Sequence, residues 1–212
     1  THAKGRFLVF TDDDCAMLES LTYLLQAEGF SVEQCRSGQQ LLAKTLWSRP
    51  ACMVIDLRLA DIDGLELRRK LRDRGIDIPT IIISGRAEIP DAVRAVKDGV
   101  LDFLTKPFDD AELIQRIRQA IVQDEENLRQ KAEMDELRER FSRLTARESE
   151  VLRCVLEGMA NKQIAASLGL SAKTVEFHRK HVMEKVEVET VTELVRLSAL
   201  LFPELRSVNR KR

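Results

Sequence analysis

Five short apolar runs that alternate with helical patterns constrain the fold of this chain more than any other feature. Each run ends on or just before a polar residue. The runs are FLVFT (7–11), SVEQC (31–35), CMVID (52–56), TIIIS (80–84) and LDFLT (101–105). Between the first two, apolar residues recur at helical spacing until Gly29 ends the pattern. Because successive parallel strands need a crossover helix, the pattern predicts an α/β fold with a doubly wound parallel sheet.

The remainder of the chain has an all-helical pattern. From Gln123 to Arg140 the sequence is charged and lacks glycine and proline, which predicts one long helix. Four further helical patterns follow it, and two of them begin with the capping boxes TARE (145–148) and TVTE (190–193). We expect Asn161 and Ser171 to cap the two helices between these boxes.

A tight turn at Gly169 joins two short predicted helices, which is the pattern of a helix-turn-helix. The chain is therefore predicted to have an α/β domain over residues 1–120, a helical linker over 121–142 and an all-α four-helix domain over 143–212. The net charge is −2 over the first of these segments, −3 over the second and +4 over the third. A basic third segment is compatible with binding to phosphates.

Composition excludes several classes of protein. With 212 residues, of which 44% are apolar and 33% charged, the chain has the composition of an ordinary globular protein with room for two modest domains. We expect a cytoplasmic location and no membrane partner, because no apolar run approaches ~20 residues and no signal peptide is evident. The four cysteines form no CxxC pair, so neither a disulfide framework nor a zinc site is expected.

The segment VIDLRLADIDG (54–64) ends an apolar run on the charge of Asp56. Taken alone, Asp56 is either a loop acid at the surface or a reactive carboxylate at the mouth of a parallel sheet. Polar residues also follow the other runs, namely Asp12, Ser84 and Lys106. The carboxyl ends of parallel strands meet at one edge of a sheet, so we expect these side chains to converge there.

That constellation predicts a specific chemistry. Neighbouring carboxylates repel one another unless a hard cation bridges them, and oxygen ligands suit Mg²⁺. A lysine and a hydroxyl group on the opposite side would hold phosphoryl oxygens, which leaves Asp56 free to act as a nucleophile. The two acids that follow Asp56 in the loop, Asp61 and Asp63, are interpreted as solvated.

The motifs TDDD, VIDLRLADIDG, IIISG and FLTKPF resemble, in order, those of the receiver domain of a two-component response regulator. The resemblance covers residues 7–120 and implies a flavodoxin-like fold. It also implies that Asp56 accepts a phosphoryl group from a histidine kinase or a small donor such as acetyl phosphate. Many relatives carry proline where Ala60 stands, which leaves the rate of the chemistry open.

The resemblance assigns a role to each residue of the site. It implies that Asp13, Asp56 and the backbone carbonyl of Arg58 bind Mg²⁺ and that Asp12 acts through water. Lys106 and Ser84 would contact the phosphoryl group, and together with Asp56 they form the expected catalytic set. Ser84, Phe103 and Pro107 form the expected switch: Ser84 moves toward the phosphoryl group, Phe103 turns inward, and Pro107 follows a cis peptide bond.

Residues 144–200 resemble the LuxR-type helix-turn-helix, and the order of the two domains is that of the NarL/FixJ family. The recognition helix is expected over residues 172–186, with a valine stripe toward the core and charged residues outward. A solvated helix face would also explain these charges, and the resemblance favours the interpretation as a DNA contact. The expected DNA-binding residues are Lys162, Lys173, Thr174, Glu176, Phe177, His178, Arg179 and Lys180.

The last helix is expected to form a dimer interface by analogy with the family. Its predicted interface residues are Val191, Leu194, Val195 and Ser198.

Taken together, these patterns predict a phosphorylation-activated transcriptional regulator with Mg²⁺ as its cofactor. Its expected partners are a histidine kinase, a double-stranded DNA operator and a second copy of the chain when phosphorylated or bound to DNA, with RNA polymerase as a further candidate. It is expected to catalyse only its own phosphorylation and dephosphorylation. Two alternatives stay open: a metal-dependent phosphotransferase or phosphatase that uses Asp12 and Asp56, and a regulator whose receiver works without phosphorylation.

Overall fold

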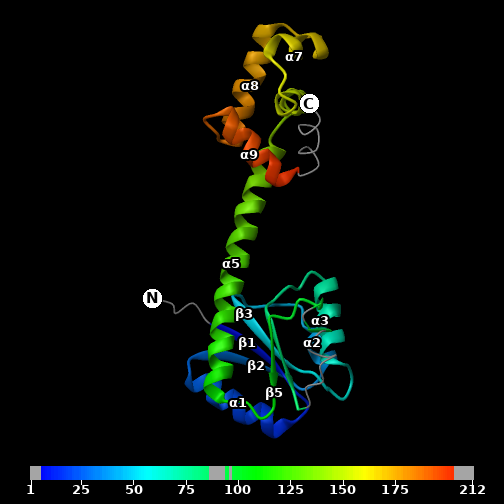
Figure 1. Ribbon diagram of the computed structural model, residues 1–212, viewed down its shortest axis with the longest axis vertical. Coiled ribbons are helices and arrows are strands. Elements are labelled where there is room, and N and C mark those ends of the chain that lie inside the picture. The colour runs from blue at the N-terminus through cyan, green and yellow to red at the C-terminus, as the bar shows by residue number, and fades with distance from the viewer. Residues whose placement is uncertain (1–5, 86–93, 96, 203–212) are drawn as a thin grey trace. The chain divides into compact units, whose positions relative to one another are not determined.

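A computed structural model describes residues 6–85, 94–95 and 97–202 (Figure 1). The chain divides into two compact units, Thr1–Arg129 and Gln130–Arg212. The first unit holds a five-stranded, wholly parallel sheet with the strand order β2-β1-β3-β4-β5. Its strands are β1 (Arg6–Thr11), β2 (Phe30–Cys35), β3 (Ala51–Asp56), β4 (Thr80–Ser84) and β5 (Asp102–Thr105).

This order confirms the predicted doubly wound sheet and locates its switch point. From β1 the chain moves outward to β2 and then returns across β1 to β3, so the order reverses between β1 and β3. Ligands of open α/β sheets bind beyond the carboxyl ends of strands at such a point. Every residue of β3 and β4 is buried, as expected for central strands covered on both faces.

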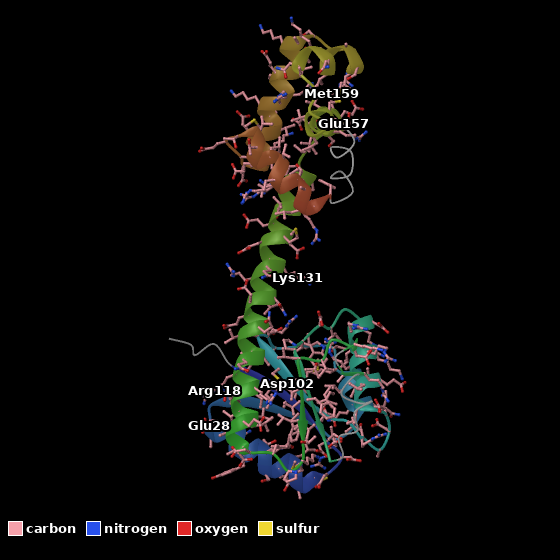
Figure 2. The ribbon with its side chains drawn as sticks, viewed as in Figure 1. Glu28, Asp102, Arg118, Lys131, Glu157 and Met159 are labelled. Atoms are coloured by element: carbon pink, nitrogen blue, oxygen red, sulfur yellow. The ribbon has the colours of Figure 1, made fainter. Side chains whose placement is uncertain are left out.

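Helices cover both faces of the sheet (Figure 1). On one face, α1 (Cys15–Ala27) and the start of α5 (Asp110–Ser142) pack against β1 through residues such as Phe10, Leu18 and Ile117. On the other, α2 (Gly38–Ala43) and α3 (Gly64–Asp73) pack through residues such as Leu41, Leu67 and Ile55. An ion pair of 2.7 Å between Arg118 and Glu28, both labelled in Figure 2, adds a contact between α5 and α1.

The long helix predicted after residue 120 is confirmed, because α5 runs unbroken from Asp110 to Ser142. Asp109 caps its start by accepting a hydrogen bond of 2.7 Å from the backbone N–H of Ala111.

Further along α5, the fully buried Asp124 fixes the helix to the first unit. Its carboxylate accepts from the backbone N–H of Ala51 at 2.8 Å and from Arg49 Nε at 3.0 Å, and it also pairs with Arg49 Nη2. Contacts between α5 and the rest of the first unit thus extend past residue 120, where the sequence analysis placed the end of the α/β domain.

Among its described residues, the second unit contains four helices after the end of α5, as the fold prediction required. These are α6 (Ala146–Leu156), α7 (Asn161–Leu168), α8 (Ala172–Val186) and α9 (Val191–Leu201). Thr145 and Glu148 form the predicted capping box of α6, and Gly169 turns the chain between α7 and α8 at a φ of 66°. Such a positive φ is the conformation in which glycine carries no steric penalty.

The predicted cap of α7 was wrong. Asn161 is the first helical residue and Ala160 occupies the cap position. The Gln163 side chain accepts from the Ala160 backbone N–H at 2.8 Å, while Asn161 Oδ1 accepts from Arg179 at 3.0 Å. Asn161 therefore links α7 to α8, whereas Ser171 caps α8 as expected, accepting from Thr174 at 3.1 Å.

In the part of the chain that the structure describes, no helix has both the length and the hydropathy required to cross a membrane.

Replacing Asp124 should strongly destabilise the first unit. We expect Asp124→Ala to lower the free energy of unfolding by about 3 kcal/mol, because it leaves Arg49 and the Ala51 N–H without their buried carboxylate. Trp47 is the only tryptophan of the chain, so its fluorescence during urea unfolding reports on this unit. The matched control is Glu125→Ala, which removes an exposed acid next to it and should change the value by less than about 0.5 kcal/mol. Equal effects of the two variants would contradict the anchoring role of Asp124.

Candidate functional site

Three charged side chains meet at the carboxyl edge of the sheet, beside its switch point. Asp12 follows β1, Asp56 ends β3 and Lys106 follows β5. The Lys106 Nζ lies 2.5 Å from Asp56 Oδ2 and 2.9 Å from Asp12 Oδ2. Asp12 and Asp56 are only 1% and 6% exposed, so one ammonium group neutralises part of a largely buried pair of acids.

Burial and pairing shift the pKa values of this cluster. Burial of Asp12 raises the pKa of its carboxyl, and this outweighs the hydrogen bonds from the Asp14 N–H and from Lys106. Burial alone would lower the pKa of the Lys106 ammonium group, but its hydrogen bonds to Asp56 and Asp12 raise that pKa above the ordinary value. Lys106 is therefore fully charged at neutral pH.

The backbone holds the two acids in place. Asp56 Oδ1 accepts a hydrogen bond of 2.7 Å from the N–H of Arg58, and Asp12 Oδ1 accepts one of 2.9 Å from the N–H of Asp14. Asp14 itself caps α1 by accepting from the next N–H groups of the helix. Asp13 is exposed. The three consecutive acids thus occupy three different environments.

The donor atoms at this edge suit a hard cation. Asp12 and Asp56 present carboxylate oxygens, and Mg²⁺ prefers oxygen ligands. Among the described residues, no three acidic, histidine or cysteine side chains are grouped closely enough to form a ready metal site. The pair of acids fits the cation chemically, and the contribution of Asp13 and of the Arg58 carbonyl stays a prediction.

The predicted switch residues lie on β4 and β5. Ser84 is 1% exposed at the end of β4, and its carbonyl accepts from the Lys106 N–H at 2.8 Å. Phe103 is partly buried and packs against the core cluster on the face of α2 and α3. The peptide bond between Lys106 and Pro107 is cis, as expected.

Asp61 is exposed, as predicted, whereas Asp63 is partly buried, and both acids accept hydrogen bonds within the chain that the sequence analysis did not predict. Asp61 accepts from the N–H groups of Gly38 and Gln39 at 3.0 and 2.8 Å, and Asp63 caps α3. Burial alone would raise the pKa of Asp61, but these hydrogen bonds lower it below its ordinary value. Both acids therefore hold the loop that follows Asp56.

Gly64 is a residue of the site that the sequence analysis missed. A Cβ atom at this position would lie 2.4 Å from the carbonyl oxygen of Asp56, which is closer than non-bonded atoms approach. The Gly64 N–H donates to the Leu57 carbonyl at 2.8 Å. The only sequence signal was a glycine eight positions after an acid, and that signal is common.

The second unit presents a charged outer face on α8. Val175 and Val182 are buried, while Lys173, Glu176 and Lys180 are exposed, as the recognition-helix prediction required. Phe177 stands out because its large apolar side chain is 56% exposed. Lys162 on α7 is also exposed.

Two predicted DNA contacts already make hydrogen bonds within the protein, and a third is partly buried. Thr174 shares the capping interaction of Ser171, with 2.8 Å between the two hydroxyl oxygens. Arg179 donates to Asn161, and His178 is half-buried.

Leu194 and Ser198 were wrongly predicted as interface residues. They are 2% and 1% exposed, and the Ser198 hydroxyl donates to the Leu194 carbonyl at 2.7 Å within α9. A side chain buried in its own unit has no surface to offer a partner. Val191 and Val195 are 37% and 39% exposed, so they alone of the four predicted residues present apolar surface.

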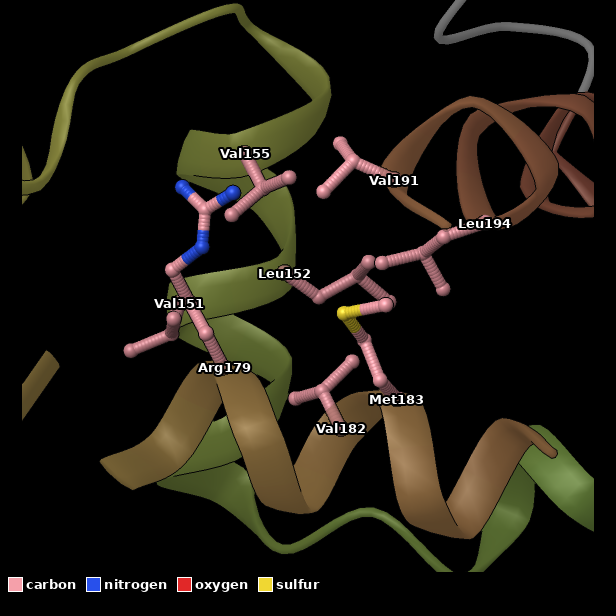
Figure 3. Close-up of a pocket in the computed structure, with 8 residues that line it drawn as sticks. All are labelled: Val151, Leu152, Val155, Arg179, Val182, Met183, Val191 and Leu194. Carbon is pink, nitrogen blue, oxygen red and sulfur yellow. The ribbon is translucent and has the colours of Figure 1, made fainter. Parts of the chain in front are cut away.

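The space between α6, α8 and α9 is a packing gap. Figure 3 shows it lined by Val151, Leu152, Val155, Arg179, Val182, Met183, Val191 and Leu194. Its volume is about 10 Å³, which is too small for any ligand larger than a water molecule.

Glu148 is a second buried acid that holds an ion pair. It is 3% exposed and accepts from Lys185 Nζ at 2.6 Å and from the Thr145 N–H at 2.7 Å. Burial alone would raise the pKa of Glu148, but these hydrogen bonds outweigh it and lower the pKa to about 2. The capping box revealed the contact with Thr145, whereas nothing local revealed Lys185, which lies 37 residues away.

Comparison with known families assigns both units. Residues 8–118 match the model described as "Response regulator receiver domain", and residues 142–198 match "Bacterial regulatory proteins, luxR family".

Similar proteins span nearly the whole chain. "Transcriptional regulatory protein FixJ" of Azorhizobium caulinodans is 41% identical over 89% of this chain and 90% of its own length. "Response regulator protein TodT" of Pseudomonas putida is 40% identical over 93% and 87%. Among solved structures, that of response regulator StyR is similar with a TM-score of 0.78 and 35% identity, covering 92% of this chain and 98% of the other.

The low pKa of Glu148 predicts how the stability of the second unit depends on pH. A carboxyl whose pKa falls from 4.5 in the unfolded chain to about 2 in the folded chain adds about 3 kcal/mol above pH 4.5. This contribution is lost as the pH falls through about 2. We therefore expect Glu148→Gln to lower the melting temperature at pH 7, and the difference from the wild type to shrink below about pH 4.5.

Far-UV circular dichroism measures the helical transition, and Trp47 fluorescence separates it from unfolding of the first unit. The control is Glu150→Gln on the same helix, whose acid is 44% exposed and pairs with Arg147 at 2.6 Å. The melting temperature of this control should differ only slightly from that of the wild type at every pH. A difference between Glu148→Gln and the wild type that is constant from pH 7 down to about 2 would contradict the assignment.

Proposed function

Because this chain belongs to the response regulators that combine a receiver domain with a LuxR-type DNA-binding domain, we propose that phosphorylation of Asp56 controls its binding to DNA. Regulation of transcription is the function common to this family architecture. The observation that carries the assignment of Asp56 is the contact of one lysine, Lys106, with two buried acids at the switch point of the sheet.

The proposed reaction is transfer of a phosphoryl group to the Asp56 carboxylate. An Asp56 oxygen attacks the phosphorus of a phosphohistidine or of acetyl phosphate, the bond to the leaving group breaks, and its electron pair stays with that group. Mg²⁺ would be held by Asp13, Asp56 and the carbonyl of Arg58, with Asp12 acting through water, and when bound it would supply neutralising charge at the phosphoryl oxygens.

Two residues would then respond to the new dianion. The Lys106 ammonium pairs with a phosphoryl oxygen in place of the Asp56 carboxylate. The Ser84 hydroxyl donates a hydrogen bond to another phosphoryl oxygen. This bond is worth about 1–3 kcal/mol, which is enough to shift the equilibrium between two conformations of the receiver surface. Phe103, which is only partly buried, turns inward behind Ser84 in this proposal.

The proposed division of the chain is a receiver over residues 1–120, a helical linker over 121–142 and a DNA-binding domain over 143–212. The partners are a cognate histidine kinase and an operator in double-stranded DNA, with RNA polymerase as a further candidate. A partner that is genomic DNA implies that the function is carried out in the cytoplasm. The receiver would catalyse only its own phosphorylation and dephosphorylation.

On DNA, α8 is proposed to enter the major groove. Phe177 contacts a thymine methyl group, Glu176 accepts from cytosine N4 and Lys180 donates to guanine. Lys162 and Lys173 contact phosphates, which fixes register without reading sequence. Arg179, Thr174 and His178 act mainly by supporting the helix, since Arg179 and Thr174 are already bonded within the unit and His178 is half-buried.

Dimerisation on DNA is proposed to use the exposed side of α9. Val191 and Val195 lie four residues apart and present apolar surface on one side of the helix. A two-fold dimer would predict inverted half-sites about one helical turn apart in the operator.

Phosphorylation of Asp56 has a direct test by mass spectrometry. Incubation with acetyl phosphate and Mg²⁺ should add the mass of one phosphoryl group to the wild type and none to Asp56→Asn, which has no nucleophilic carboxylate. Chelation of Mg²⁺ with EDTA should abolish the gain. The matched control is Asp61→Asn in the same loop, which should still be phosphorylated. An equal gain on Asp56→Asn would remove Asp56 from its role.

The phosphate contact proposed for Lys173 predicts a change in salt dependence. Lys173→Ala should weaken binding to all DNA sequences about equally and reduce the slope of log K against log salt by about 1. Fluorescence anisotropy at several salt concentrations measures this slope. Lys131 on α5, labelled in Figure 2, is an exposed lysine outside the proposed interface. Its replacement by alanine should leave the slope unchanged, and an equal change in both variants would indicate only a general charge effect.

A further inference from the structure

The exposed Phe177 ring on α8 is not left to rotate freely. Its ring centroid lies 4.0 Å from that of His181, with the two planes tilted by 60°. The two residues are four positions apart, so they are neighbours on one side of the helix. The His178 ring lies farther away, at 5.9 Å. His181 is therefore the aromatic neighbour that limits the orientations of Phe177.

His181 in turn lies beside a buried acid on another helix. Its Nδ1 lies 3.8 Å from Oε1 of Glu148, which belongs to α6. Glu148 is 3% exposed and is fixed by Lys185 and by the N–H of Thr145. A row of neighbouring groups thus runs from the capping box of α6, past Glu148 and His181, to the Phe177 ring.

This arrangement matters because a contact with a thymine methyl group depends on the direction of the ring. A phenylalanine side chain without a neighbour samples several staggered rotamers, and only some of them direct the ring toward the edge of a base. A packed neighbouring ring selects one of these orientations and adds aromatic contact energy. Ordering before binding lowers the entropy lost when the complex forms.

We propose that His181 is a positioning residue for base recognition: it orients Phe177 toward a thymine methyl group and contacts neither base nor phosphate itself. The proposal rests on the proposed DNA-binding function of α8. It predicts that His181 determines the preference for the methyl group more than the overall affinity for DNA.

The test begins with DNA that the full-length chain itself selects. Double-stranded oligonucleotides of random sequence are enriched for binding, with and without prior treatment with acetyl phosphate and Mg²⁺. Each thymine of the enriched site is then replaced singly by deoxyuridine, which lacks only the methyl group. At one position this should weaken binding of the wild type by about threefold to fourfold, as expected for the loss of one buried methyl group.

His181→Ala should reduce that methyl effect to less than about 1.5-fold, because a freely rotating Phe177 loses most of the contact. His181→Phe keeps a ring against Phe177 and should retain the full effect. Lys180→Ala serves as the matched control on the same helix: it should weaken binding while the methyl effect stays at the wild-type value. Circular dichroism checks folding, and if His181→Ala does not fold, His181→Gln removes the ring in its place.

The outcomes separate the inference from the function on which it rests. An unchanged methyl effect in the ring-deleted variant overturns the positioning role of His181 and leaves the DNA-binding function standing. The same holds if the wild type selects DNA but no thymine methyl group affects its binding. If the wild type enriches no sequence at all, both the inference and the proposed function fail.

Discussion

The ion pair of Lys106 with two buried carboxylates is the interaction on which the first unit depends. Asp12 and Asp56 are almost fully buried, and two like charges in such a place repel strongly unless a cation lies between them. The three side chains come from the ends of three different strands, so only the observed order, with β1 beside β3, brings them together. The backbone N–H of Lys106 also donates a hydrogen bond to the carbonyl of Ser84, which connects the end of β4 to the same edge of the sheet.

The same ion pair explains how a phosphoryl group on Asp56 would affect the surface of the first unit. The Lys106 ammonium holds a carboxylate now, and a phosphoryl group on Asp56 would offer it a stronger acceptor a short distance away. Ser84 is buried behind the site and Phe103 packs only partly into the core, so a shift at the edge has a path to the surface of β5. On α8, the Phe177 ring packs against His181, whose Nδ1 lies 3.8 Å from the buried Glu148.

Periodicity and the ends of the apolar runs were sufficient to predict the sheet, the long helix and the convergence of Asp12, Asp56 and Lys106. These features follow from local patterns together with the geometry common to all parallel sheets. Contacts between distant residues were not predictable in this way. The pairing of Asp124 with Arg49 spans 75 residues, and the need for glycine at position 64 arises from a backbone approach that leaves no trace in composition. Leu194 and Ser198 were misassigned because the analogy with the family does not show which face of this helix the rest of the unit covers.

The buried ion pairs differ in how completely their acids are neutralised. Asp124 and Glu148 each receive at least two donors, including a full positive charge from Arg49 or Lys185, so each acid is neutralised by a cation of its own. At the edge of the sheet, one ammonium group serves two acids, which leaves a net charge of about −1 if both are ionised. We propose that this local excess would attract a divalent cation, which would favour the approach of a phosphoryl group that the acids alone would repel. Incomplete neutralisation at a strand end, rather than burial by itself, would then distinguish the proposed phosphoacceptor from the acids that stabilise the fold.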